Sequence, residues 1–232
     1  MKVRIAKFLS DNGVASRREA ERMIESGGVS VNGEIITSPV FFVDGSEKIT
    51  VYGKLVVADN KIKLYAFYKP INTMTTASDP MGRKTIYDVL PKEYKNLKYI
   101  GRLDYKTTGL LLMTNDGELS RILTLPSSNI PRTYIALVEG NDFSGLEKVR
   151  QGITVDGIKY RPMKIDTMKN NELKITITEG KKNEIRVVLD AVGLPVKKLH
   201  RISYGNINLG NLSVGKIKEI SQKHIDELSK SF

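Results

Sequence analysis

Cysteine and tryptophan are absent from this 232-residue sequence, and histidine occurs only twice. Without cysteine the chain can form neither disulfide bonds nor thiolate metal sites. Two histidines disfavour a zinc site and leave only carboxylate-bound Mg²⁺ open. No apolar run approaches the roughly 20 residues that a membrane-spanning helix needs, and the first residues have no signal-peptide core. We therefore expect a cytoplasmic protein with no membrane partner.

Several catalytic motifs are also absent: the sequence has no Walker loop, no G-x-G-x-x-G and no G-x-S-x-G. His200 has no obvious triad companion, and we expect it to be structural or to face RNA. Basic residues, by contrast, are in excess: 37 Lys and Arg against 26 Asp and Glu give a net charge of +11. That excess predicts a polyanionic partner, most often nucleic acid, with a merely basic surface as the alternative.

The first fifty residues have the pattern of a small helical module. Apolar residues spaced three and four apart predict a first helix that ends at Gly13. Ser16 to Glu19 has the form of a capping box, which predicts the start of a second helix. Two short apolar runs then flank Asn32-Gly33, a strong hairpin signal. The predicted order is helix, helix, hairpin, and residues 53–63 are expected to be a linker.

Five basic residues belong to the two predicted helices: Arg4, Lys7, Arg17, Arg18 and Arg22. Arg17 and Arg18 occupy a first helical turn, where cations are disfavoured unless they help backbone N–H groups to grip phosphate. The whole pattern resembles the αL RNA-binding module of the S-four type, found in a ribosomal small-subunit protein and many RNA enzymes. The resemblance implies that these five residues bind RNA; a solvated charged face is the alternative.

The rest of the chain alternates short strands with short helices. Strands are predicted at 64–68, 98–102, 109–114, 132–138, 164–168 and 172–178. Helices are predicted at 85–90, 118–123, 146–150 and 184–192. Because strands dominate, we expect an α+β fold with a largely antiparallel sheet. The predicted domains are residues 1–60 and 61–232.

One predicted loop contains a candidate catalytic residue. Gly101-Arg102-Leu103-Asp104 stands shortly before a Thr-Thr-Gly turn and an apolar run that is expected to be a buried strand. Asp104 is therefore expected in a loop that feeds a strand inside the core. Charged loop residues on a rigid scaffold are often catalytic, although most loop aspartates cap turns or face water.

Three segments together resemble the pseudouridine synthases of the RsuA/RluB family. They are residues 101–111, the basic-x-Tyr strand Arg132-Thr133-Tyr134, and residues 179–186, which lead into a helix. An S-four module ahead of the catalytic domain is the usual arrangement in that family. The resemblance implies an αL module followed by an α+β pseudouridine-synthase domain. It also implies an enzyme that isomerises a uridine in RNA without cofactor, metal or nucleotide.

The resemblance assigns roles to three residues. Asp104 is the carboxylate that either adds to the nucleotide or removes a proton from the sugar. A pocket that desolvates Asp104 requires a nearby cation to keep it ionised, and Arg186 is that partner, with a guanidinium suited to a bidentate grip. Tyr134 stacks on the base and can assist proton removal at C5. A surface arginine and a core tyrosine are the alternatives.

Other basic residues near these motifs are expected to contact RNA: Arg102, Lys106, Lys181 and Lys182. Arg102 is expected to fill the space that an extruded base vacates or to hold a phosphate. Residues 79–91 resemble the branch that acts on large-subunit ribosomal RNA. We therefore expect a monomer that modifies one uridine in a stem-loop of that RNA, where extrusion costs least.

Three other functions share some of these features. They are a small-subunit ribosomal RNA pseudouridine synthase, a non-catalytic assembly factor that binds ribosomal RNA, and an RNA methyltransferase with the same N-terminal module. The net positive charge and the N-terminal RNA-binding module are compatible with all three functions. The catalytic motif positions favour an enzyme over an assembly factor, and a methyltransferase needs a nucleoside-cofactor loop that the sequence does not contain.

Overall fold

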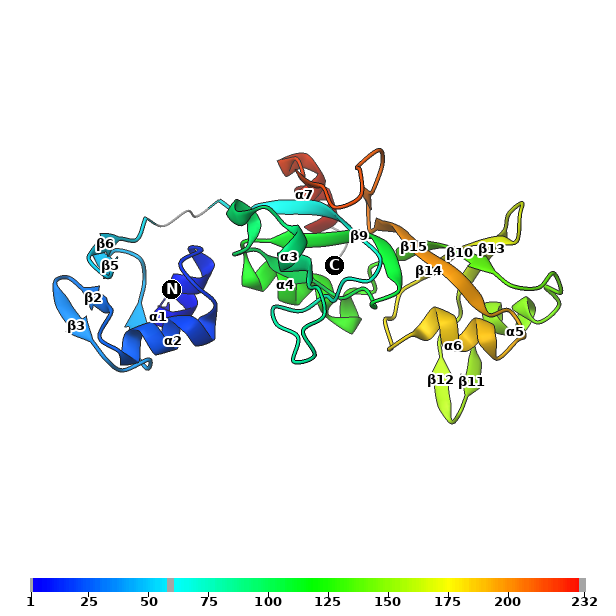
Figure 1. Cartoon of the computed structure of the whole chain (residues 1–232), viewed down its shortest axis with the longest axis horizontal. Coiled ribbons are helices and arrows are strands. Elements are labelled where there is room, and N and C mark those ends of the chain that lie inside the picture. Colours follow the sequence, from blue (N-terminus) through cyan, green and yellow to red (C-terminus); the bar gives the residue numbers. More distant parts are fainter. Residues whose placement is uncertain (1, 58–60, 230–232) are drawn as a thin grey trace. The chain divides into compact units, whose positions relative to one another are not determined.

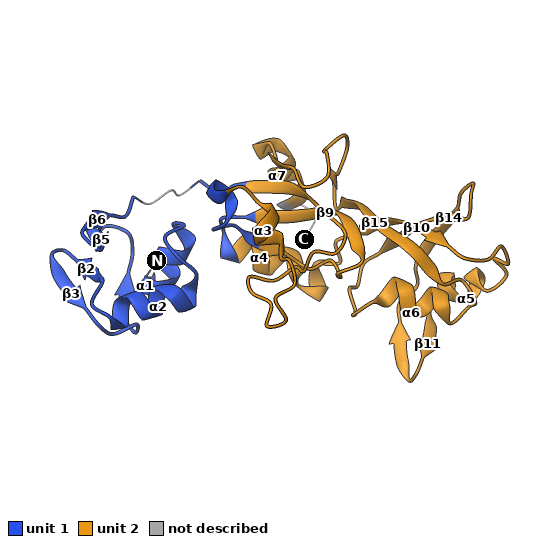
Figure 2. Ribbon diagram, in the orientation of Figure 1, with its two compact units in different colours: residues 1–63, 92–98, 114–117 blue, residues 64–91, 99–113, 118–232 orange. Residues whose placement is uncertain are grey.

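The computed structural model describes residues 2–57 and 61–229, which form two compact units (Figures 1 and 2). Unit 1 comprises residues 1–63, 92–98 and 114–117, and unit 2 comprises residues 64–91, 99–113 and 118–232. Among the described residues, no helix has both the length and the apolar character needed to cross a membrane.

Unit 1 contains both predicted helices, α1 (Ile5–Asp11) and α2 (Arg17–Glu25). The Ser16 hydroxyl accepts a hydrogen bond from the Glu19 N–H at 3.3 Å, as the capping prediction requires. Apolar residues one helical turn apart, such as Ile5 and Leu9, are fully buried. Burying each such side chain stabilises the unit by about 1.5–3 kcal/mol.

Short strands complete unit 1: β1 (Val3–Arg4), β2 (Val29–Val31), β3 (Glu34–Ile36), β4 (Phe42–Val43), β5 (Ile49–Val51) and β6 (Lys54–Leu55). The predicted β2–β3 hairpin is confirmed, with positive φ at both Asn32 (52°) and Gly33 (91°), as a type I′ turn requires. Strand β6 lies inside the expected linker, so that part of the prediction is wrong, and residues 58–60 lie outside the described chain. Strands of only two or three residues are too short to show the alternation of apolar and polar residues by which a strand is predicted from sequence.

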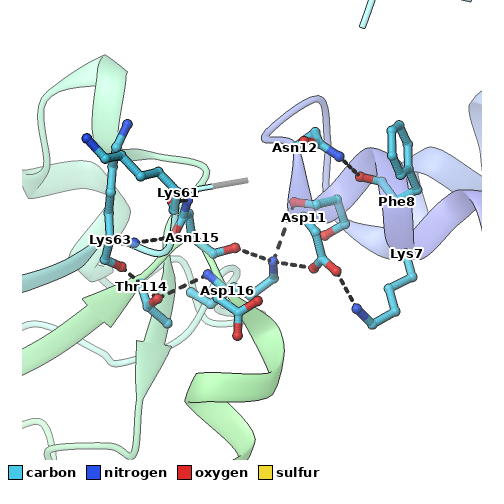
Figure 3. A network of polar contacts seen from close by, with 11 residues as sticks. Lys7, Phe8, Asp11, Asn12, Lys61, Lys63, Thr114, Asn115 and Asp116 are labelled. Atoms are coloured by element: carbon cyan, nitrogen blue, oxygen red, sulfur yellow. Dashed lines mark hydrogen bonds and ion pairs between the residues drawn. The ribbon is translucent and has the colours of Figure 1, made fainter. Parts of the chain in front are cut away.

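A polar network joins α1 to the other two segments of unit 1 (Figure 3). Lys98 Nζ lies 3.0 Å from both Asp11 Oδ1 and the Asn115 carbonyl oxygen. Lys7 pairs with the same Asp11 carboxylate. Burial opposes ionisation of Asp11, but the hydrogen bonds from Lys7 and Lys98 outweigh it and hold the pKa of that carboxyl below its ordinary value.

Unit 2 is built on a nine-stranded sheet with the strand order β13–β14–β10–β15–β9–β7–β17; β16 pairs with β15, and β8 with β9. The strands are β7 (Leu64–Lys69), β8 (Lys98–Ile100), β9 (Thr107–Thr114), β10 (Arg132–Val138), β13 (Lys164–Thr167), β14 (Glu172–Ile177), β15 (Val196–Tyr204), β16 (Ile207–Asn208) and β17 (Ile217–Glu219). Strand β10 pairs antiparallel with β14 and β15, as do β13 with β14, β16 with β15 and β17 with β7, whereas β15 pairs parallel with β9. The expectation of a largely antiparallel sheet is confirmed.

The helices of unit 2 are α3 (Ile86–Val89), α4 (Gly117–Thr124), α5 (Leu146–Gln151), α6 (Glu184–Asp190) and α7 (Gln222–Ser229). Two single 3₁₀ turns occur at Lys92–Tyr94 and Pro126–Ser128, and a separate hairpin joins β11 (Ile153–Val155) to β12 (Ile158–Tyr160). Helix α6 packs against α5, β11 and β15 (Figure 1). One face of the sheet and helices α4 and α7 share an apolar core that includes Leu110, Leu123 and Leu228.

The sequence does not predict β11, β12, β15, β16, β17 or α7. Strand β15 is the important omission, because it joins the antiparallel part of the sheet to β9. Lys197, Lys198 and Arg201 interrupt its apolar pattern and hide the period of two. The predicted helix at 184–192 ends earlier, at Asp190, and the predicted strand at 98–102 ends at Ile100.

Candidate active site

Unit 2 contains a cavity of about 560 Å³ into which the predicted motifs converge. Its walls come from the loop at 101–104, strand β10, the end of β14, the loop at 178–183, the start of α6 and strand β15. Asp104 and Tyr134 both line it, although they are separated in the chain by a helix and a strand. The fold therefore brings together two of the three residues that sequence reasoning assigned to catalysis.

The loop that carries Asp104 is held by its backbone. Five successive carbonyl oxygens, from residue 103 to residue 107, each accept a hydrogen bond. The donors are Thr75 Oγ1 to Leu103 (2.8 Å), Thr107 N to Asp104 (2.9 Å), Asn72 N to Tyr105 (2.9 Å), Arg186 Nη2 to Lys106 (3.2 Å) and Lys69 Nζ to Thr107 (2.9 Å). A loop bonded at every carbonyl has little freedom to move, so the position of Asp104 is fixed.

Two expectations about Asp104 and Arg186 need correction. The Asp104 side chain is exposed at the cavity, so the site does not desolvate it before a substrate enters. The Arg186 guanidinium donates to two backbone carbonyls, those of Val196 (2.8 Å) and Lys106 (3.2 Å), and not bidentately to the carboxylate. The guanidinium therefore contacts the loop of Asp104 through a backbone carbonyl of that loop. Burial lowers the pKa of Arg186, and the nearby Asp104 charge opposes that shift.

Tyr134 occupies a place where the sheet is irregular. The register of β10 with β15 shifts between Thr133 and Tyr134, so that Tyr134 lies opposite Arg201. Such bulges re-aim side chains and are common beside active sites. Tyr134 is buried, with 7% of its surface exposed, and its hydroxyl lies 3.5 Å from Arg201 Nη1. The guanidinium of Arg201 also lies over the ring of Tyr204, at 5.3 Å from its centroid.

Two buried cations lie near Asp104. Lys69 is fully buried, and its ammonium donates to the carbonyls of Pro70 (3.0 Å) and Thr107 (2.9 Å). Arg201 is 2% exposed and donates from Nε to the Leu110 carbonyl at 2.6 Å. Burial lowers the pKa of Lys69 to about 8, Arg201 adds to the shift, and the Asp104 charge opposes it. The exposed carboxylate of Asp104 thus shares the cavity with Arg201, and the Lys69 ammonium is bonded to the loop that carries it.

Comparison with known proteins decides the family. The family model described as RNA pseudouridylate synthase matches residues 63–191, and an S4 domain model matches residues 3–49. An uncharacterized RNA pseudouridine synthase of Aquifex aeolicus is 41% identical over 238 residues, which cover 100% of this chain and 95% of the relative. The ribosomal large subunit pseudouridine synthase B of Bacillus subtilis is 36% identical over 232 residues, covering 97% and 95%. The chain belongs to the RNA pseudouridine synthase family.

A solved structure supports the same conclusion for the fold of the synthase. A crystal structure of a pseudouridylate synthase aligns with a TM-score of 0.70 and 26% identity, over 97% of this chain and 99% of that chain. The expected architecture is therefore confirmed: an S4 domain followed by a pseudouridine synthase fold with a mostly antiparallel, mixed sheet.

The residues expected to contact RNA fall into two groups in the synthase. One group is exposed and forms no salt bridge within the part of the chain that the structure describes: Arg4, Arg17, Arg18, Arg102, Lys106 and Lys182. Lys7, Arg22 and Lys181 pair with Asp11, Glu19 and Glu179, respectively. Surface pairs of this kind contribute about 0–1 kcal/mol, so phosphate can compete for the cations.

Sequence reasoning missed three residues of the cavity region: Lys69, Glu184 and Arg201. Lys69 is recognisable only as part of a Lys-Pro pair after a strand. Arg201 lies with Leu199 and Ser203 on the buried face of β15, but its charge breaks the apolar pattern that would have marked this face in the sequence. Glu184 has no local signal, since a glutamate in a first helical turn is ordinary. The side chain of His200 donates to or accepts from Thr108 Oγ1 at 2.9 Å, which fits the structural role expected for it.

Proposed function

We propose that this synthase converts one uridine in a stem-loop of large-subunit ribosomal RNA to pseudouridine, with Asp104 as the catalytic carboxylate. In this proposal residues 1–60 bind RNA and residues 61–232 carry the chemistry. The large-subunit assignment is supported by the name of the Bacillus subtilis relative and by the resemblance of residues 79–91. That loop is preorganised, because Arg83 grips the Asp79 carboxylate through Nε (3.1 Å) and Nη2 (2.7 Å).

The observation that carries the proposal is an exposed carboxylate on an immobilised loop at the cavity that Tyr134 also lines. Isomerisation breaks the bond between N1 and C1′ and forms a bond between C5 and C1′. The C5 hydrogen leaves as a proton and N1 gains one, so no oxidant, reductant or group donor is required. A carboxylate serves either route, by adding to the nucleotide or by taking a proton from the sugar.

Arg186 and Lys69 are proposed to keep Asp104 in place and ionised. Each donates to a carbonyl of its loop, and the charge of each interacts with the carboxylate. When a nucleotide displaces water from the cavity, the cations lie in a medium of lower dielectric constant. Their attraction for the carboxylate then grows and offsets its loss of hydration.

Tyr134 is proposed to stack on the extruded base, with its phenol near C5. Extrusion costs a few kcal/mol, least for a base that is already unpaired in a loop. Stacking on an aromatic ring returns about 1–3 kcal/mol. Arg102 lines the same cavity two residues before Asp104 and is proposed to fill the vacated stack or to hold a phosphate. Lys106, Lys181 and Lys182 add phosphate contacts.

The two helices of unit 1 are proposed to bind the RNA backbone outside the target site. Arg17 and Arg18 are exposed on α2, and Arg4 is exposed at the end of β1, immediately before α1 and not inside the helix as predicted. Lys7 and Arg22 are available once their surface pairs open. Each phosphate contact that is removed should reduce the slope of log affinity against log salt by about 0.7–0.9.

Separate incubation with unmodified large- and small-subunit transcripts tests the proposal. We expect a single pseudouridine in the large-subunit transcript and none in the small-subunit transcript. Modification confined to the small-subunit transcript would overturn the substrate assignment, and tight binding without any pseudouridine would indicate an assembly factor.

A further inference from the structure

A second carboxyl lies at the cavity, in a setting opposite to that of Asp104. Glu184 is the first residue of α6, lines the cavity and is only 3% exposed. Its Oε2 accepts the Lys181 N–H at 3.0 Å, and its carboxyl lies within hydrogen-bond reach of the Glu179 carboxyl. Its Oε1 is buried and accepts no hydrogen bond in the part of the chain that the structure describes.

Glu179 is the better placed of the two carboxyls to carry the negative charge. Its Oε1 accepts the Arg161 N–H at 2.7 Å, and its Oε2 lies 2.5 Å from the Lys181 ammonium. Two carboxyl groups in hydrogen-bond contact cannot both be ionised without strong repulsion, so one of them holds a proton. The donors gathered on Glu179 leave that proton on Glu184.

The charges around the pair agree with this assignment. Burial raises the pKa of Glu184 to about 8, and the hydrogen bond and charge of Glu179 act in the same direction. Burial opposes ionisation of Glu179, but its bonds from Arg161, Lys181 and Glu184 outweigh that and lower its pKa. The other charged groups near the pair are Arg161, whose Nε lies 4.0 Å from Glu179 Oε2, Arg132 on β10, which donates to the Glu179 carbonyl at 3.2 Å, and Arg186 on α6 itself. Of the elements that pack against α6, α5 carries Glu147, Lys148 and Arg150, β15 carries Lys197, Lys198, His200 and Arg201, and β11 carries no charged residue.

We propose that Glu184 is a positioning residue: as the protonated member of a carboxyl pair with Glu179, it ties the first turn of α6 to the loop at 179–183. Arg186 is two residues further along the same short helix, and its guanidinium bonds the Lys106 carbonyl in the loop of Asp104. The carboxyl pair therefore sets the position of Arg186 and, through it, of Asp104. The inference rests on the proposed function, since Asp104 matters only if it is catalytic.

The kinetic test uses the full chain with Glu184→Gln, Glu184→Ala and the surface control Glu139→Gln, whose side chain is 63% exposed. A glutamine donates the same hydrogen bond to Glu179 and never ionises. The ratio of single-turnover rates, Glu184→Gln to wild type, should rise about tenfold from pH 7 to pH 9, because only the wild type loses its proton there. The Glu139→Gln ratio should stay flat. Glu184→Ala should be slower than wild type at pH 7, with RNA affinity changed less than the rate.

A ratio for Glu184→Gln that stays constant from pH 6.5 to 9 would overturn the inference, as would a folded but inactive glutamine variant at every pH. A second measurement needs neither RNA nor activity. Infrared difference spectra of wild type minus Glu184→Gln should show a protonated carboxyl band at pH 7 that fades as the pH passes 8. If that band is absent, Glu184 is not the protonated member of the pair, whatever the enzyme's substrate. If the band is present and no pseudouridine forms, the proposed function fails instead.

Discussion

Gly109 lies where the backbone of β9 leaves no room for a side chain beside β15. It has a φ of +107°, pairs with Arg201 across the parallel β9–β15 contact, and follows the loop of Asp104. A Cβ placed there would lie 2.2 Å from the Arg201 carbonyl oxygen and 2.7 Å from its nitrogen. Ordinary contact begins at 3.4 Å, so Gly109→Ala requires β9 and β15 to separate by about 1.2 Å.

The expected loss of stability has two parts. A left-handed backbone conformation costs an alanine about 1–2 kcal/mol. Parting the strands weakens ladder hydrogen bonds, each contributing about 0.5–1.5 kcal/mol, and disturbs Arg201 and its buried bonds. Together they predict a destabilisation of about 3–5 kcal/mol, which for a chain of this size lowers Tm by roughly 6–20 °C.

Thermal unfolding monitored by circular dichroism measures the effect, with Gly157→Ala as the matched control. Gly157 also has a positive φ, +76°, at the β11–β12 turn, but no atom lies within 4 Å of the Cβ position. The control should lose only the backbone part, about 1–2 kcal/mol. Equal melting temperatures for the two variants would refute the claim that the close approach of β9 and β15 governs this site.

Three further predictions concern the cavity. Arg186→Met should lower the single-turnover rate at least tenfold while RNA affinity changes little. Arg186→Lys should recover only part of the lost rate, because one ammonium cannot span the Val196 and Lys106 carbonyls. A normal single-turnover rate for Arg186→Met would contradict this prediction. Tyr134→Phe should bind RNA normally and react more slowly if the phenol moves a proton, whereas full activity in both Tyr134→Phe and Tyr134→Leu would return this residue to a packing role. The pKa of Glu184 rises from 4.5 to about 8 on folding, so between these values the folded state binds one more proton than the unfolded state. The free energy of unfolding should therefore fall by up to about 1.4 kcal/mol for each pH unit in that range. Urea unfolding of Glu184→Gln across the same range should lack this decline.

Some parts of the site could be predicted from sequence, and the reason is local. Residues 109–114 are continuously apolar, which predicts a buried strand and therefore a loop at Asp104. The basic-x-Tyr pattern similarly placed Tyr134 on a strand, and the structure confirms that strand. The bonds that immobilise the loop could not be predicted, because Thr75, Lys69 and Arg186 come from separate segments that meet only after folding.

The partner of Arg186 shows the same limit more sharply. A guanidinium and a carboxylate in motifs of the same site suggest an ion pair, but in the folded chain the guanidinium donates to the carbonyls of Val196 and Lys106, which come from two other segments. Strand β15 was hidden because a cavity floor requires Arg201 on its inner face, which breaks the apolar alternation that marks a strand. The position of Arg201 in the cavity is therefore what made β15 hard to recognise in the sequence.

The most direct test of the account is pseudouridine mapping of an unmodified large-subunit transcript after incubation with wild-type protein or with Asp104→Asn. The account predicts one pseudouridine with the wild type and none with Asp104→Asn, although the variant should bind the transcript within a few-fold of the wild type because it loses no phosphate contact. A pseudouridine formed at that site by purified, folded Asp104→Asn would contradict the central claim that Asp104 carries the chemistry.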